Sequence, residues 1–328
     1  VMGITAKGAW ESVKRHFREI GANIQKQDFT VVGVGDMSGD VFGNGMLLSK
    51  HIKLVGAFNH LHIFVDPDPD PAKSIAERKR LFKLPRSNWT DYSKKLISRG
   101  GAIYERSAKS LSLSPEVRKL FEIPKDRVTP NELMGYMLRA EADLMWFGGI
   151  GTYVKAAFES DMDVGDRAND AIRINGAELR CKVLGEGANL GVTQLGRIEY
   201  ALKGGRLNTD SIDNSAGVDC SDHGRLSVPK RNKLLASMTN EVGRLVLRHN
   251  YLQTQAMSMI QSKGVQNLDN QIRLMRMLER AGCLNRAVEF LPDDETLSER
   301  AAAKQGLSRP EIAIVMSYAK IWLYDELL

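Results

Sequence analysis

The sequence predicts an α/β fold: a doubly wound, mainly parallel sheet followed by an all-helical C-terminal portion. Two observations predict it. Over residues 1–226, short β-branched runs alternate with helical patterns, an order that gives right-handed crossovers between parallel strands. After about Leu226, glycines and strand-like runs become scarce, and apolar residues recur at helical spacing. We therefore expect an α/β domain over 1–226 and a helical region over 227–328.

The first part of the chain predicts a helix, a glycine turn and three strands. Apolar residues recur every three or four positions until Gly21, which can end a helix. These apolar residues are Ala9, Val13, Phe17 and Ile20. The elements expected next are a buried strand over 29–34, a helix over 39–50, and strands over 52–58 and 62–65. Alternating prolines between Asp66 and Pro71 end this strand region, because proline cannot donate to a strand ladder.

The remaining elements are less regularly spaced. A helical pattern resumes at Ala72, and residues 84–128 are rich in loops, with short helices near 91–99 and 115–121. Thr129-Pro-Asn-Glu132 predicts a helix start, because Thr can cap, Pro fits the first turn and Glu can complete a capping box. The other expected elements are strands over 142–147 and 179–184, and helices over 228–262, 268–282, 296–305 and 309–326.

The composition is typical of a globular protein, with 43% hydrophobic and 26% charged residues among 328. No apolar run approaches the roughly 20 residues that a membrane span needs, so no membrane partner is expected. The three cysteines are far apart and lack metal-ligand spacing, which favours a cytoplasmic location and no metal site. Because the chain opens on Val1, we expect it to be part of a longer protein.

Positive charge is concentrated in one stretch. Residues 71–130 contain 15 lysines and arginines but only 6 acidic residues. A basic block of this kind can bind nucleic acid, but apolar residues at helical spacing dilute it and few aromatic residues interleave as a stacking platform needs. We therefore interpret it as a basic, partner-facing insertion, and expect no nucleic-acid partner.

The most informative segment lies at residues 29–39, where a β-branched run breaks into glycines. A strand, a tight turn and a helix N-terminus in this order let the backbone approach a pyrophosphate, as in Rossmann-like folds. Gly33 and Gly35 stand where the first two fingerprint glycines belong, and Ser38 replaces the third. Glycines after a strand also serve turn geometry alone, so this motif by itself leaves both interpretations open.

Other breaks rich in glycine or asparagine follow the predicted strands. In an open parallel sheet, ligands bind beyond the carboxyl ends of the strands, so such loops can converge on one crevice. Asn189 and Asn214 can donate and accept hydrogen bonds together, which suits a carboxamide or a ribose. Each break taken singly is also compatible with an ordinary turn. The four breaks lie at 33–39, 148–152, 185–189 and 214–217.

Particular residue strings narrow the function. Gly185-Glu-Gly-Ala-Asn189, and Asn214-Ser-Ala-Gly-Val218 with Ser221 after it, resemble the EGAN and NAGGVxxS segments of glutamate dehydrogenases. Thr5-Ala-Lys-Gly8 resembles their TGRG turn, and Gly33-Val-Gly-Asp-Met-Ser38 their GFGNVG. The fuller strings around residues 4–17 and 34–45 resemble the very large bacterial NAD-specific enzymes, and this resemblance runs through essentially the whole chain.

The resemblance implies a Rossmann-like dinucleotide-binding domain and roles for single residues. Asn189 and Asn214, with Thr5, would hold the nicotinamide end of NAD, and Ser221 would meet the distal carboxylate of glutamate or 2-oxoglutarate. Gly149, in the break after the strand expected at 142–147, would belong to the same cofactor site. The residues that would wrap the pyrophosphate are Gly33, Gly35, Asp36, Met37 and Ser38.

Two departures from the family pattern matter. Asn59 aligns with the acidic residue that usually binds the adenosine ribose, about 20 residues after the glycines, so it would bind a ribose hydroxyl without charge. The substrate domain of this family, with its lysine and aspartate, precedes the TGRG-like turn. Here that turn lies at residues 5–8, so we expect no catalytic residue in this chain and no activity of the chain alone.

The resemblance also implies partners: glutamate or 2-oxoglutarate, a catalytic domain elsewhere in the same protein, and further copies in a homo-oligomer. Two other functions remain open. One is a non-catalytic Rossmann-like module with weak or lost cofactor affinity, which the changes at Ser38 and Asn59 would explain. The other is a methyltransferase that binds S-adenosylmethionine at the glycine turn, which leaves Asn189, Asn214 and Ser221 unexplained.

Overall fold

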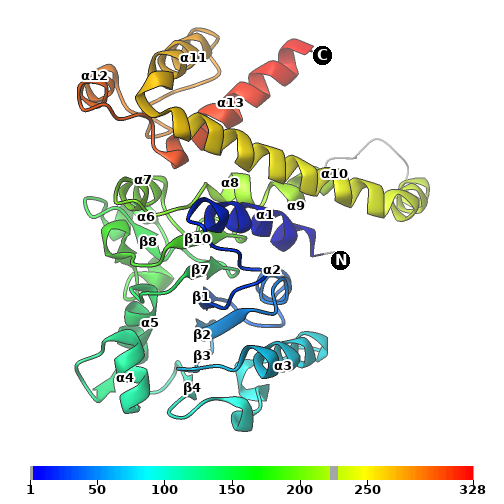
Figure 1. Ribbon diagram of the computed structural model, residues 1–328, viewed down its shortest axis with the longest axis vertical. Helices are drawn as coiled ribbons and strands as arrows, with labels where there is room; N and C mark the ends of the chain where they lie inside the picture. The colour runs from blue at the N-terminus through cyan, green and yellow to red at the C-terminus, as the bar shows by residue number, and fades with distance from the viewer. Residues whose placement is uncertain (1–2, 222–227, 328) are drawn as a thin grey trace.

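The structure is a computed structural model that describes residues 3–221 and 228–327 (Figure 1). Its centre is a six-stranded sheet with the order β10-β7-β1-β2-β3-β4. Four neighbouring strands run parallel, and the last two extend the sheet in antiparallel fashion. The parallel strands are β10 (Val183–Glu186), β7 (Leu144–Phe147), β1 (Phe29–Val34) and β2 (Ile52–Phe58), and the antiparallel strands are β3 (His62–Val65) and β4 (Ala102–Glu105).

The doubly wound, mainly parallel sheet confirms the predicted fold class. Strands β1, β2 and β3 have the bounds that their apolar runs predict. Strand β7 begins two residues later than expected, and β10 is shifted toward Glu186. Strand β4 was not expected, because Ala102–Glu105 is only partly buried at the sheet edge and shows no apolar alternation.

The two faces of the sheet carry separate apolar cores, as alternation along the strands requires. On β1, Val31 belongs to one core and Val32 to the other, and on β7 Trp146 and Phe147 divide in the same way. Helices α1 (Ile4–Glu19), α2 (Asp40–Gly45) and α3 (Pro71–Lys83) contribute to the core that holds Trp146. Helices α4 (Pro115–Phe121) and α5 (Pro130–Leu138) contribute to the other core.

The helix start at Thr129 is confirmed in detail. Thr129 Oγ1 accepts a hydrogen bond from the Glu132 backbone N–H, and Glu132 Oε2 accepts one from the Thr129 N–H at 2.7 Å. The helix expected over 39–50 is shorter, since α2 ends at Gly45. Around Asp91 there are only the 3₁₀ turns Trp89–Asp91 and Lys94–Leu96 in place of a short α-helix.

Several short elements lie between the main ones and were not predicted. Two-stranded pairs are formed by β5 (Leu111–Ser112) with β6 (Arg127–Val128), and by β8 (Val154–Lys155) with β9 (Ile174–Asn175). Short helical elements are α6 (Asp161–Val164), α7 (Gln194–Leu202), α8 (Asp210–Asp213) and α9 (Ser215–Ser221), and the 3₁₀ turns Arg167–Asn169, Gly176–Glu178 and Gly264–Asn267.

The basic stretch 71–130 is built into the α/β body, because it supplies α3 and the sheet strand β4. Several of its arginines bond backbone carbonyls. Arg78 is fully buried and donates to the carbonyls of Met46 and Ile52, and Arg118 donates to those of Ile123 and Pro124. These arginines therefore stabilise the fold of the α/β body through hydrogen bonds to the backbone.

The C-terminal part is helical, as predicted, and consists of α10 (Val228–Lys263), α11 (Leu268–Arg280), α12 (Asp294–Ala302) and α13 (Arg309–Leu327). Helix α10 lies along α1 and α9, and α11, α12 and α13 extend beyond it (Figure 1). These helices share an apolar core of their own that includes Met257, Met275 and Leu278. None of the helices within 3–221 and 228–327 is long and apolar enough to cross a membrane.

Candidate functional site

The carboxyl ends of the parallel strands meet at one edge of the sheet. The strand order reverses between β1 and β7, because the chain passes from β1 to β2 on one side and β7 pairs with β1 on the other. Ligands of open α/β sheets bind at such a switch point, where the loops diverge. Two adjoining cavities of about 1010 and 820 Å³ lie there. Both are lined by Gly148, Gly149, Ile150, Ala168 and Asn169, so together they form one cleft.

The larger half of the cleft gathers predicted residues from three distant segments. Thr5 comes from the start of α1, Asn189 from the loop after β10, and Asn214 from the end of α8. The side-chain amide of Asn214 donates to Asn189 Oδ1. Gly149 lies between the two halves. Thr5, Asn189 and Asn214, which are far apart in the sequence, therefore line the same half of the cleft, as expected.

One of the four predicted breaks is not a loop after a strand. Asn214 ends α8 and Ser215–Ser221 forms α9, so the expectation of a strand before 214–217 is wrong. The segment still reaches the cleft, because α8 and α9 lie beside α1 and bring Asn214 and Gly217 to its wall. Ser221 is the last residue of α9, and its side chain lies outside the described residues.

The smaller half of the cleft is lined by Gly35, Asp36 and Asn59, together with Arg106. Gly35 has φ +136°, and a Cβ there would lie 2.7 Å from Phe42 Cβ. A side chain is therefore excluded both by the backbone conformation and by the close approach of α2. The glycine is required for the turn itself, whatever ligand the turn meets.

Three other residues of the glycine turn do not line the cleft. A Cβ on Gly33 would meet the Phe42 ring at 2.7 Å, so Gly33 allows strand β1 to pack against α2. Met37 is buried in the core beneath the turn. Gly33, Met37 and Ser38 are not among the residues that line either half of the cleft.

Asp36 already uses the backbone groups that a pyrophosphate would need. Its Oδ1 accepts hydrogen bonds from the N–H groups of Ser38 and Gly39, at 2.9 and 3.1 Å, and from Ser38 Oγ at 2.6 Å. A negative group that satisfies the donors ahead of α2 competes with a phosphate for them. Pyrophosphate recognition at these N–H groups would therefore require the Asp36 carboxylate to move.

Asn59 has a structural role at the corner between β2 and β3. Its Oδ1 accepts from the N–H groups of Leu61 and His62, and its Nδ2 donates to Asp36 Oδ2 at 2.8 Å. Its carbonyl accepts from Arg106 Nη1 at 2.8 Å, and burial lowers the pKa of that guanidinium. The amide is 7% exposed, which leaves it little capacity to bind a ribose.

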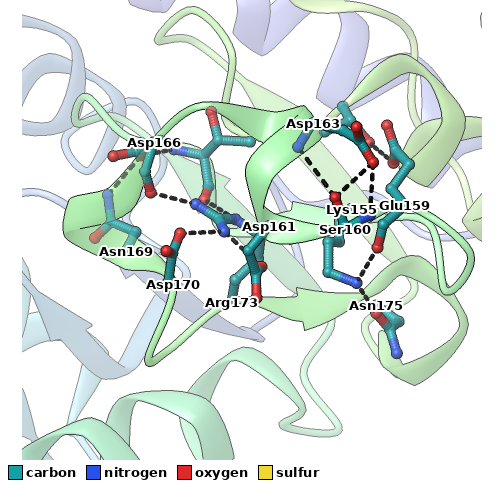
Figure 2. Close-up of polar contacts among 12 residues, drawn as sticks. Lys155, Glu159, Ser160, Asp161, Asp163, Asp166, Asn169, Asp170, Arg173 and Asn175 are labelled. Carbon is teal, nitrogen blue, oxygen red and sulfur yellow. Dashed lines mark hydrogen bonds and ion pairs between the residues drawn. The ribbon is translucent and has the colours of Figure 1, made fainter.

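The wall formed by residues 152–175 is braced by one buried cation (Figure 2). Arg173 donates from Nε to the Thr152 carbonyl and from Nη2 to the Asp166 carbonyl. Its Nη1 pairs with Asp161 at 2.6 Å and with Asp170 at 2.7 Å, and the side chain is fully buried. These bonds fix the segment that carries the shared lining residues Ala168 and Asn169. Sequence reasoning missed Arg173, although a cation among four aspartates within 161–173 was a usable signal.

A second buried ion pair anchors the loop after β10. Arg197 of α7 donates from Nε and Nη2 to the two carboxylate oxygens of Glu186, at 2.7 and 2.8 Å, and both residues are buried. Arg197 also lies 3.1 Å from Asp210, whose other oxygen accepts from the Leu190 N–H. The loop that presents Asn189 is therefore tied to α7 and α8. A charged residue at the end of an otherwise apolar strand was the signal for this pair.

Comparison with known proteins identifies the family. A family model described as bacterial NAD-glutamate dehydrogenase, catalytic domain, matches residues 1–260. The chain belongs to the bacterial NAD-glutamate dehydrogenase family. The resemblance read from the EGAN-like and GFGNVG-like strings is thereby confirmed.

Relatives of this family member are similar along its whole length. NAD-specific glutamate dehydrogenases of Halomonas elongata, Pseudomonas aeruginosa and Mycobacterium tuberculosis are 56%, 55% and 51% identical over 100% of the chain. The chain spans only 21% of the length of each of these proteins. The hetero-hexameric glutamate dehydrogenase of Thermus thermophilus is 13% identical over 80% of this chain and 48% of its own, with a TM-score of 0.44.

Proposed function

We propose that this chain is the NAD-binding portion of a glutamate dehydrogenase, which converts L-glutamate to 2-oxoglutarate and ammonia by hydride transfer to NAD. Family membership supports the reaction class. The observation that carries the proposal is the two-part cleft at the switch point between β1 and β7. A dinucleotide has two ends joined by a pyrophosphate, and the cleft has two halves joined at Gly148 and Gly149.

In this proposal the nicotinamide end lies in the larger half, against Thr5, Asn189 and Asn214. The adenosine end lies in the smaller half, beside Asp36 and Asn59. Because Asn59 is occupied at the β2–β3 corner, Asp36 is the better acceptor for a ribose hydroxyl, and Asn59 orients it through the 2.8 Å bond. The pyrophosphate passes Gly149, where a Cβ would come within 3.4 Å of Gly35 Cα.

The reaction needs more than this chain. We propose that Ser221 binds the distal carboxylate of the substrate and that a domain elsewhere in the parent protein supplies the catalytic lysine and aspartate. Closure of the two domains over the cofactor would exclude water and bring the substrate α-carbon to the nicotinamide. Residues 1–226 and 227–328 would then act as a cofactor domain and a helical assembly region of a cytoplasmic homo-oligomer.

The binding part of the proposal is tested by titrating the chain with NADH and following nicotinamide fluorescence and heat. Saturable binding below millimolar NADH supports it, whereas no signal up to millimolar cofactor favours the alternative of a module that has lost cofactor affinity. The catalytic part is tested by glutamate-dependent reduction of NAD. We expect turnover by the full-length protein and none by residues 1–328 alone. Turnover by the chain alone would contradict the assignment of catalytic residues to another domain.

A further inference from the structure

A separate cavity lies where the helical part meets the α/β body. It measures about 600 Å³, and no residue lining it lines the cleft. Its walls come from the end of α1, the end of α7 and the loop after it, the last turns of α10 and the start of α13. A volume of this size accommodates a small organic molecule.

The charged groups that line this cavity are unbalanced. They are the guanidinium groups of Arg15, Arg206 and Arg309 and the carboxylate of Glu19, which gives a formal charge of +2. Two bridging groups hold the three cations together. Glu19 pairs with Arg15 at 3.2 Å and with Arg206 at 2.7 Å, and Ser258 Oγ accepts from Arg15 at 3.3 Å and from Arg309 at 3.1 Å.

Arg309 has no carboxylate bonded to it among the described residues. It is 2% exposed and donates to Asn208, Thr254, Ser258 and Gln261, all of which are neutral. Asn208, which accepts from Arg309, donates in turn to the buried carboxylate of Asp213. The five hydrogen bonds that Arg309 donates use all five N–H groups of the guanidinium, so Arg309 attracts an anion through its charge and not through a free donor.

The surroundings of His16 show the same excess of positive charge. This α1 side chain is fully buried, and within 3–221 and 228–327 neither ring nitrogen has a hydrogen-bond partner. Burial lowers its pKa well below the ordinary value, and Arg309, Arg206 and Arg15 lower it further. His16 therefore adds no positive charge, and among the residues that the structure describes Glu19 is the one acid that lines the cavity.

We propose that this cavity binds a small organic dianion, a phosphate monoester or a dicarboxylate, through hydrogen bonds from Arg15 and Arg206, with Arg309 contributing its positive charge. Arginine binds both groups by paired hydrogen bonds. The terminal nitrogens of Arg15 are available, because its contacts within the described residues use Nε. A dianion matches the formal charge, and the small or apolar lining at Ala201, Gly204 and Met259 leaves room for a carbon skeleton. The ligand would bridge the α/β body and the helical part.

The test uses the full-length protein, with glycerol 3-phosphate and succinate as separate probes at constant ionic strength. Calorimetry should give saturable binding of at least one probe, and that probe should raise the melting temperature by mass action. The probe that binds more tightly identifies the ligand class. Inorganic sulfate serves as a third probe, and sulfate binding as tight as either organic dianion would overturn the proposal of an organic ligand.

Matched variants locate the binding. R15Q and R206Q should each weaken the dianion at least tenfold, and R15K should restore part of the affinity. R18Q is the control, because Arg18 is an exposed arginine on the same helix and does not line the cavity. The absence of saturable binding, or affinity unchanged in both R15Q and R206Q, would overturn the proposal. NADH affinity is measured in parallel, since the inference does not rest on the cofactor site.

Discussion

The side-chain amide of Asn59 donates a hydrogen bond to the carboxylate of Asp36 across 2.8 Å, joining the ends of β2 and β1. In most dinucleotide sites the residue at the end of the second strand is itself acidic and binds the adenosine ribose. Here the acid stands one strand away, and the amide holds it. The two side chains therefore act as a unit, and a change at either position changes both.

The first prediction is that an acidic residue at the end of β2 lowers the stability of the protein. In N59D two carboxylates would face each other at the distance of the present hydrogen bond, and like charges this close repel. We expect the free energy of unfolding to fall by about 1–3 kcal/mol, as for loss of a buried hydrogen bond, with no gain in NAD affinity. Urea unfolding and calorimetry measure the two effects. N270D, at an exposed asparagine of α11, is the control. Tighter NAD binding with unchanged stability would show that Asn59 merely replaces the ribose acid.

The second prediction separates two adjacent glycines of the loop after β7. A Cβ on Gly148 would lie 2.7 Å from the Phe42 Cα, a backbone atom that cannot move aside, whereas a Cβ on Gly149 has ordinary contacts of 3.4 Å or more. We expect G148A to lower the free energy of unfolding by roughly 1–3 kcal/mol, as overpacking does. G149A should fold normally and weaken NADH about tenfold, because its methyl group narrows the passage between the halves of the cleft. Equal stability of both variants, measured by thermal unfolding, would argue against the packing explanation.

Much of this fold was predictable because its signals are local. The strands β1, β2 and β3 are short apolar runs, β1 is followed by Gly35 and β3 by the proline-rich segment from Asp66, and the Thr129 capping box is completed within four residues. Strand β4 was missed because it is an edge strand, and its partners on β3 lie 37 to 43 positions earlier in the chain. Whether such an edge strand forms depends on the strand that it pairs with, and its own amino-acid composition predicts it poorly.

The cleft was partly predictable for a related reason. The sequence showed which loops follow strands, and topology alone places those loops at one edge. It did not show which of these side chains form hydrogen bonds within the protein. Asp36 and Asn59 were expected to face a ligand, yet they bond to each other, and that hydrogen bond joins residues 23 positions apart and depends on the three-dimensional arrangement of two strands. Arg173 was missed for the same reason, since it acts on Thr152, 21 residues away.

The third prediction concerns that arginine. A lysine at position 173 has one ammonium group and cannot replace a guanidinium that serves two backbone carbonyls and two carboxylates. We expect R173K to lower the free energy of unfolding by about 3 kcal/mol. Amide hydrogen exchange over residues 152–170 should accelerate, and NADH binding should weaken. R167K, at an exposed arginine of the same segment, should change none of these. Unchanged exchange in R173K would show that the wall does not depend on Arg173.

The last prediction is a pH dependence that arises at Asp213. This side chain is buried, accepts hydrogen bonds from Asn208 Nδ2 and the Glu186 N–H, and has no cation bonded to it among the described residues. Burial raises its pKa from 3.8 to about 6, against the opposing effect of those hydrogen bonds and of Arg309. The folded state therefore binds a proton more tightly than the unfolded state. Its contribution to stability is complete below pH 4 and is lost as the pH rises through about 6.

Because one pKa unit corresponds to about 1.4 kcal/mol, the shift at Asp213 is worth on the order of 3 kcal/mol. Other groups titrate in the same range, so the informative quantity is the difference between the wild type and D213N, whose side chain is neutral at every pH. We expect the wild type to lose about 3 kcal/mol relative to D213N between pH 4 and pH 7, measured by urea unfolding. D126N, at an exposed aspartate, should track the wild type at every pH. A constant difference between D213N and the wild type would mean that Asp213 stays ionised throughout, with Asn208 and Arg309 outweighing its burial.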